Sequence, residues 1–248
     1  MNSSAAPSVD PSEVEQFSAL AAEWWDPKGP FKPLHEFNPV RVGFIRDQVC
    51  VTQGQEPLAV NPLSGLAIAD IGCGGGLLSE PIARLGAQMT SVDPSEKNIA
   101  CASLHAQQMG LNIDYRQTTV EELAETGIQF DVVLAMEVLE HVADIPSFMQ
   151  ACDAILKPGG TFIGATLNRT LKSLAMAKIG VEYILRWLPI GTHDWDKFLT
   201  PAETTRALRD AGLPLNLIQG VTYNPLKGEW HLGSDTDINY MVVARKPT

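Results

Sequence analysis

LAIADIGCGGGLLS, residues 66–79, is the stretch that decides the fold of this chain. An apolar run ends at the acid Asp70, and an apolar pattern typical of a helix begins at Leu77. Between them stand Gly72, Gly74, Gly75 and Gly76. Glycine takes positive φ at no steric cost and lets a ligand approach the backbone, while a helix N-terminus presents unpaired N–H groups. The stretch therefore predicts a strand, a glycine loop and a helix that together hold a nucleotide-like ligand.

The order of the glycines narrows the choice of ligand. A dinucleotide fingerprint needs glycines in the order G-x-G-x-x-G. Counting from Gly72, the sixth position is Leu77. The fingerprint fails, so we expect a nucleoside without a pyrophosphate.

Outward from the loop, strand-like and helix-like segments alternate regularly. The expected strands are 66–71, 87–92, 113–117, 130–135 and 161–166, and the expected helices are 77–85, 95–109 and 147–156. Such alternation implies right-handed crossovers and a parallel sheet that is covered on both faces. The predicted fold class is a doubly wound, Rossmann-like α/β domain.

The 248 residues are expected to form a single domain with attachments. We expect a disordered tail over 1–11, a helical cap over 12–60, the ligand-binding core over 62–166 and an insertion over 167–199. The remainder, 200–248, should hold a helix and two last strands. The helix should begin at a capping box of Thr200 and Glu203, with Pro201 in the first helical position.

Charge and composition restrict the partners and the compartment. A net charge of -11 without a dense basic cluster argues against nucleic acid. The four cysteines are scattered singly, which is typical of buried thiols in a reducing compartment. The chain has neither a basic, apolar leader nor an apolar run near the ~20 residues of a membrane span. We therefore expect a cytoplasmic protein.

Asp93 follows the second strand, about twenty residues past the glycine loop, where an acid in this fold accepts hydrogen bonds from ribose hydroxyls. The alternative is that Asp93 only caps the helix after Pro94. Asp70 could face an amino group of the ligand or a neighbouring part of the backbone. Both readings of Asp70 stay open at this point.

Four motifs in order carry a family resemblance: IADIGCGGG, SVD, FDVVLAMEVLEHV and LKPGGTFI. They resemble the motif set of class I S-adenosylmethionine-dependent methyltransferases. The flanking WWDPKGPFKPLHEFNPVRVGFI, THDWDKF, YNP and DINYMV resemble the ubiquinone-biosynthesis O-methyltransferases, so the likeness extends from Phe17 to Arg245. It implies a seven-stranded sheet whose last strand is antiparallel, and methylation of phenol hydroxyls on polyprenylated rings.

The resemblance also implies cofactor contacts. S-adenosylmethionine would be held by Arg41, Asp70, Gly72, Gly74, Asp93, Thr118 and Met136. A guanidinium can grip the methionyl carboxylate through two hydrogen bonds, which supports the role of Arg41. The alternative for Arg41 is an ordinary surface arginine on the second helix. Thr118 stands where enzymes of this class contact adenine.

Glu137, Glu140 and His141 follow the fourth strand at the edge where ligands of such sheets bind. Two carboxylates and an imidazole could hold a hard divalent cation such as Mg2+, which would lower the pKa of the substrate phenol. The resemblance also implies a metal ion, because the eukaryotic relatives look metal-dependent through an E-x-x-E-H motif of this kind. The alternative is a metal-free site in which His141 is a base or a structural residue.

The activated sulfonium needs little from the protein beyond alignment and a base near the phenol. His141 is the first candidate for that base and His193 the second, although His193 could equally be a loop residue with a backbone partner. Rival readings of the chain are a methyltransferase of soluble phenols and a non-catalytic lipid-binding scaffold that retains the cofactor pocket.

Residues 168–190 form an amphipathic insertion that is too long for an ordinary connection. On a helix, one face would carry Leu174, Ala177, Val181, Ile184, Leu185 and Leu188, and the other Lys172, Lys178, Glu182 and Arg186. The insertion could be a lid over the site. A polyprenyl tail in the bilayer favours instead a helix that lies on an anionic membrane, at the inner face of the cell membrane. Other enzymes of ubiquinone biosynthesis are further expected partners.

Overall fold

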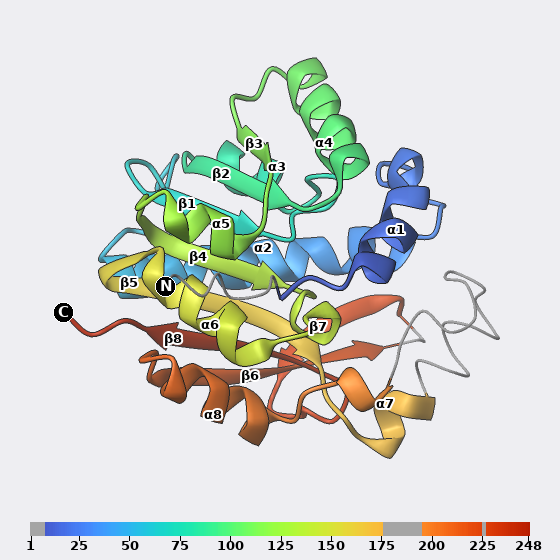
Figure 1. Ribbon diagram of the computed structural model, residues 1–248, viewed down its shortest axis with the longest axis vertical. Helices are drawn as coiled ribbons and strands as arrows, with labels where there is room; N and C mark the ends of the chain where they lie inside the picture. The colour runs from blue at the N-terminus through green and yellow to red at the C-terminus, as the bar shows by residue number, and fades with distance from the viewer. Residues whose placement is uncertain (1–7, 176–194, 225–226) are drawn as a thin grey trace, which may run out of the picture.

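The computed structural model describes residues 8–175, 195–224 and 227–248. They form one eight-stranded sheet in the order β3-β2-β1-β4-β5-β8-β6-β7 (Figure 1). The parallel strands are β1 (Ala67–Ile71), β2 (Gln88–Asp93), β3 (Asp114–Gln117), β4 (Phe130–Met136) and β5 (Leu156–Leu167). The others are β6 (Leu215–Asn224), β7 (Glu229–Gly233) and β8 (Asn239–Arg245), and β8 runs antiparallel to β5.

The predicted doubly wound sheet and its antiparallel last strand are therefore confirmed. The seven expected strands are present, and β7 adds an eighth that pairs antiparallel with β6. Sequence reasoning missed β7 because its five residues EWHLG are mostly exposed and form no apolar run. Trp230 of β7 nevertheless packs on Phe37, which ties this edge of the sheet to the N-terminal cap.

Helices cover both faces of the sheet. One face carries α5 (Val120–Glu125), α6 (Ile145–Ala154) and α8 (Pro201–Asp210), and the other carries α2 (Lys32–Gln53) and α3 (Ser79–Arg84). Neighbouring residues of β4 serve the two cores in turn, since Val133 belongs to the first and Val132 to the second, and both are fully buried. Helix α4 (Glu96–Gln108) packs on β2 and β3. A strand buried on both faces explains the continuous apolar run of β4.

The N-terminal cap differs from the expectation in its details. The first helix is split into α1 (Pro11–Ala19) and the short 3₁₀ turn η1 (Ala21–Glu23). Residues 8–10, which we expected to be disordered, are placed against the domain, whereas residues 1–7 lie outside the described residues. The carbonyl of Ser8 accepts from the Ala143 amide at 2.7 Å, and Val9 forms an antiparallel bridge with Val142. The small, polar composition of the tail gave no sign of these distant partners.

The C-terminal part contains α7 (Leu171–Ala175), the 3₁₀ turn η4 (Trp195–Lys197) and α8. The predicted capping box is confirmed, because the Thr200 hydroxyl accepts from the Glu203 amide at 3.3 Å while the Glu203 carboxylate accepts from the Thr200 amide at 2.8 Å. Residues 176–190 of the amphipathic insertion lie outside the described residues. Across the part of the chain that is described, no helix has the length and apolar character that a membrane span requires.

Candidate active site

The candidate site is a cavity of about 350 Å³ at the carboxyl edge of the sheet. Parallel strands end together at this edge, which is where such sheets bind ligands. Ten sequence-predicted residues line the cavity: Arg41, Asp70, Gly72, Gly74, Asp93, Thr118, Met136, Glu137, Glu140 and His141. The eleventh, His193, lies outside the described residues. Ten residues that the sequence predicts for the site thus lie around one cavity, although several of their contacts differ from the expectations.

The conformation of the glycine loop depends on close packing against neighbouring side chains of the protein. Gly72 and Gly74 have φ of 68° and 52°, a region that side chains rarely adopt. A Cβ on Gly74 would lie 2.4 Å from the Trp24 ring, and one on Gly72 would lie 2.7 Å from Val138. Both positions thus require glycine for the turn and for close packing against neighbouring side chains.

Asp93 fastens this loop to the start of α4. Its Oδ2 accepts from the Gly74 amide at 2.9 Å, and its Oδ1 accepts from the Ser95 amide at 2.9 Å and the Asn98 side chain at 3.1 Å. The alternative that Asp93 is the helix cap is wrong, because Ser95 is the N-cap of α4. Burial raises the pKa of Asp93. A carboxylate has about four acceptor positions, so one remains for a ribose hydroxyl.

Trp24 links the N-terminal cap to the same carboxylate. Its Nε1 donates to Asn98 at 3.0 Å, and its ring stacks on Phe31 with the ring centroids 3.7 Å apart. In the sequence, Trp24 stands out only as part of the flanking stretch WWDPKGPFKPLHEFNPVRVGFI. Nothing local marked it as a loop contact, because Asn98 lies 74 residues further along the chain.

Arg41 is 4% exposed on α2, so the reading of a surface arginine is wrong. Its Nη2 donates to Asn38 at 3.0 Å, whereas its buried Nε has no partner among the described residues. A buried guanidinium with an unsatisfied donor suits a ligand carboxylate. Nearby, Asp70 accepts from the Ser79 hydroxyl at 2.6 Å, and burial raises the pKa of Asp70 to about 6.

Thr118 and Met136, which were both expected to contact the cofactor, line the cavity. The Thr118 hydroxyl donates to Glu122 at 2.7 Å, so any contact with adenine would be shared with that bond. Met136 ends β4 and is 7% exposed. Its side chain provides an apolar part of the cavity wall between Asp93 and Glu137.

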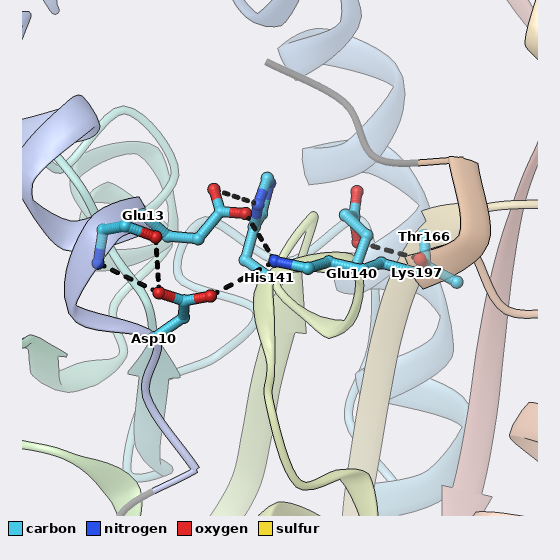
Figure 2. Close-up of polar contacts among 7 residues, drawn as sticks. Asp10, Glu13, Glu140, His141, Thr166 and Lys197 are labelled. Atoms are coloured by element: carbon cyan, nitrogen blue, oxygen red, sulfur yellow. Dashed lines mark hydrogen bonds and ion pairs between the residues drawn. The ribbon is translucent and has the colours of Figure 1, made fainter. Parts of the chain in front are cut away.

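Figure 2 shows the polar corner around His141. His141 Nδ1 lies 3.2 Å from Glu13 Oε2 on α1, and Phe17 of the same helix packs edge-on against the imidazole at 5.0 Å. Burial lowers the pKa of His141, but the hydrogen bond to Glu13 and the charges of Glu140 and Glu13 outweigh it and raise that pKa. Sequence analysis missed Glu13, which lies 128 residues before its partner.

A lysine completes the corner from the other end of the chain. Lys197 of η4 donates to Glu13 Oε1 at 3.0 Å and to Asp10 Oδ2 at 3.3 Å (Figure 2). Its charge lies next to the carboxylate that contacts His141. Three segments distant in sequence, 10–13, 139–141 and 195–197, therefore meet at one place.

The expected metal ligands are not arranged as a ligand set. No three His, Cys, Asp or Glu side chains converge as a metal site within 8–175, 195–224 and 227–248. Glu140 accepts from the Thr166 hydroxyl at 2.8 Å, whereas the next residue, His141, faces Glu13. Glu137 has a left-handed φ of 59°, and burial together with Glu140 raises its pKa to about 7. Adjacent residues of the short turn η2 (Leu139–His141) thus serve different partners.

Comparisons with known proteins give full-length relatives. The ubiquinone biosynthesis O-methyltransferase of Methylobacterium nodulans is 53% identical over 247 residues, which are 100% of this chain and 99% of that protein. The one from Parvibaculum lavamentivorans is 56% identical over 239 residues, covering 96% of this chain and 94% of that protein. A family model described as a methyltransferase domain matches residues 69–164.

Solved structures share the fold at low identity. A magnesium protoporphyrin IX methyltransferase from Synechocystis, with bound S-adenosylhomocysteine, matches with a TM-score of 0.55 and 23% identity, over 83% of this chain and 84% of that one. A possible histamine N-methyltransferase from Thermotoga maritima matches with a TM-score of 0.59 and 15% identity, over 94% and 99%. These likenesses support the architecture alone.

The role of Asp93 is testable with Asp93→Asn. The side-chain amide of Asn has nearly the size of the carboxylate, but its NH2 group would face one of the N–H groups that now donate to Asp93. At least one hydrogen bond to a charged acceptor is then lost, and such a bond is worth about 1.5–3 kcal/mol. We expect the affinity for S-adenosylhomocysteine, measured by calorimetry, to fall about 10- to 100-fold. Asp114→Asn, on exposed β3, is the matched control and should leave the affinity unchanged. An unchanged affinity of Asp93→Asn would contradict this role.

Proposed function

The chain belongs to the ubiquinone biosynthesis O-methyltransferases, and we propose on this premise that it methylates a phenolic hydroxyl of a polyprenylated ring with S-adenosylmethionine. The observation that carries the proposal is full-length identity above 50% to relatives of that name. The cavity supports it, because ten residues predicted for this chemistry line one space.

The residues present fit the cofactor. The remaining acceptor position of Asp93 suits a ribose hydroxyl, and the unpartnered Nε of Arg41 suits the methionyl carboxylate. When bound, S-adenosylmethionine supplies a methyl group on a sulfonium that is already activated. The protein then has to align the acceptor oxygen in line with the methyl group and remove the phenol proton.

We assign the proton transfer to His141. In the tautomer whose Nδ1–H donates to Glu13, Nε2 is the ring nitrogen that can accept a proton. Glu13 acts as a positioning residue, since it fixes the tautomer and stabilises the imidazolium that forms. With the cofactor bound, Nε2 would take the phenol proton as the phenol oxygen displaces the sulfonium sulfur from the methyl carbon, and the sulfur would leave as the thioether of S-adenosylhomocysteine.

Two variants test this assignment. A general base contributes about 10²- to 10⁴-fold, so His141→Asn should lower kcat by that factor while the affinity for S-adenosylhomocysteine is kept. Glu13→Gln should lower kcat less, because the amide oxygen can still accept from Nδ1. His231→Asn is the matched control on exposed β7. Full turnover of His141→Asn would show that His141 is not the general base. If the wild-type protein transfers no labelled methyl group, the chain is a non-catalytic scaffold.

A requirement for Mg2+ would demand a rearrangement of this corner. Glu140 would have to leave Thr166, and His141 would have to leave Glu13. We therefore derive no step through a metal ion and expect turnover of a polyprenylated catechol to persist in excess chelator. If chelator abolishes turnover, and Mg2+ restores it while dilution of the chelator does not, the enzyme requires the ion. That result would overturn the arrangement proposed for His141.

We further propose a cytoplasmic protein that docks on an anionic membrane through residues 168–190, where the polyprenyl tail of its substrate lies. The support is the amphipathic pattern of the sequence together with the 78% exposure of Leu171. Lys172 contributes less than expected, because it is paired with Asp235 at 3.0 Å and Asp237 at 3.2 Å. Arg169 is likewise paired with Glu203, so we assign the contacts with lipid headgroups to Lys178 and Arg186, which lie outside the described residues. Other enzymes of the pathway stay further proposed partners.

Flotation on vesicles that contain anionic lipid checks the docking. Replacing both Ile184 and Leu185 by Glu should abolish flotation, because carboxylates oppose apolar insertion and anionic headgroups alike. Val60→Glu places the same charge on a side chain that is 94% exposed outside the insertion, and it should float like the wild type. Retained flotation of the double variant would instead make the insertion a lid.

A further inference from the structure

The cavity continues beyond the residues assigned to the cofactor. In the sheet order, β1, β4 and β5 separate β2, which ends at Asp93, from β8, which begins at Asn239. Since β8 is antiparallel, its first residue lies at the edge where the parallel strands end, and Asn239 pairs with Leu167 at the end of β5. Asn239, Ile238 and Trp230 of β7 line this far end of the cavity.

Two polar atoms at this end have no partner among the described residues. Asn239 is 8% exposed, and its buried Oδ1 accepts no hydrogen bond. The buried Nε1 of Trp230 donates none. Leaving such a group unsatisfied costs about 1–3 kcal/mol, and folded proteins rarely do so. An acceptor and a donor left open in one cavity indicate a ligand with polar groups that complement both.

The Trp230 donor belongs to a ring that packs against two other aromatic rings. The Trp230 ring packs between Phe37 at 4.7 Å and Tyr223 at 5.1 Å. The same Phe37 ring lies under the guanidinium of Arg41, 5.2 Å from it. Arg41 is the residue assigned to the methionyl carboxylate, so the Phe37 ring contacts both Trp230 and the residue proposed to hold that end of the cofactor.

We propose that Asn239 and Trp230 determine specificity by binding polar substituents on the substrate ring. Asn239 Oδ1 accepts from a ring hydroxyl that is not being methylated, and Trp230 Nε1 donates to a ring oxygen. The two residues then account for the preference of the site for a dihydroxylated ring over a monophenol. This inference rests on the proposed function, and it adds the residues that select among phenols.

The cost of leaving these groups unpaired sets how strongly the site prefers one substrate over the other. A site built to hydrogen-bond a substrate hydroxyl rejects the analogue that lacks it, because its own buried polar groups are then left unpaired. A loss of about 1–3 kcal/mol corresponds to roughly 5- to 150-fold in affinity. Replacing the side chain that makes the hydrogen bond should erase the difference in affinity between the two substrates. The weaker binding of the analogue should be nearly unchanged.

The experiment compares a short-chain prenylated catechol with the matching prenylated phenol that lacks the second hydroxyl. We measure calorimetric binding of both to the protein saturated with S-adenosylhomocysteine, and kcat/KM with S-adenosylmethionine. The wild type should prefer the catechol in both assays. Asn239→Leu and Trp230→Phe should each weaken catechol binding about tenfold or more and phenol binding less than threefold. Asn112→Leu, which changes an exposed asparagine, is the matched control.

The two assays separate the inference from the function on which it rests. Equal losses on catechol and phenol, or no loss on either, would overturn the proposed recognition. Catechol-selective binding that the variants erase would support it even if the wild type transferred no methyl group, and that second result would overturn only the proposed function. Unchanged affinity for S-adenosylhomocysteine in both variants excludes a general loss of the cavity.

Discussion

The carboxylate of Asp93 is the interaction on which the site depends. It accepts from Gly74 in the glycine loop, from Ser95 at the start of α4 and from Asn98 one turn further along. Asn98 in turn accepts from Trp24, so the N-terminal cap is fastened to the same point. One buried charge thus holds a loop, a helix and a cap in register, and the spacing of the cavity walls follows from it.

The electrostatic character of the cavity fits a cationic cofactor. Burial raises the pKa of Asp70 to about 6 and that of Glu137 to about 7, while Arg41 favours the ionised form of both. A sulfonium and an ammonium placed among these carboxylates would favour their charged forms further. Asp70 and Glu137, whose pKa values burial raises, are therefore the carboxyl groups that a positively charged ligand would return to the ionised form.

The sequence predicted the sheet, the glycine loop and the cavity wall because their signals are local. The apolar runs of β1 and β4, the glycines from Gly72 and the acid at the end of β2 can each be recognised within about ten residues. The missed contacts are those between segments far apart in sequence. Glu13 meets His141, and Asn239 meets the end of β5, only after the chain has folded. The sequence pattern also does not predict which way a side chain points, since the neighbours Glu140 and His141 contact different partners.

The N-terminal segment has a consequence for how the protein is made. Residues 8–13 are synthesised before their partners, which come much later in the chain: Glu121 bonds Ser8, His141 faces Glu13, and Lys197 reaches Asp10 across 187 positions. Contacts of such sequence separation form late, because loop closure must precede them. A segment that is synthesised before its partners is thus among the last to dock, and its part of the cavity wall forms only when most of the sheet exists.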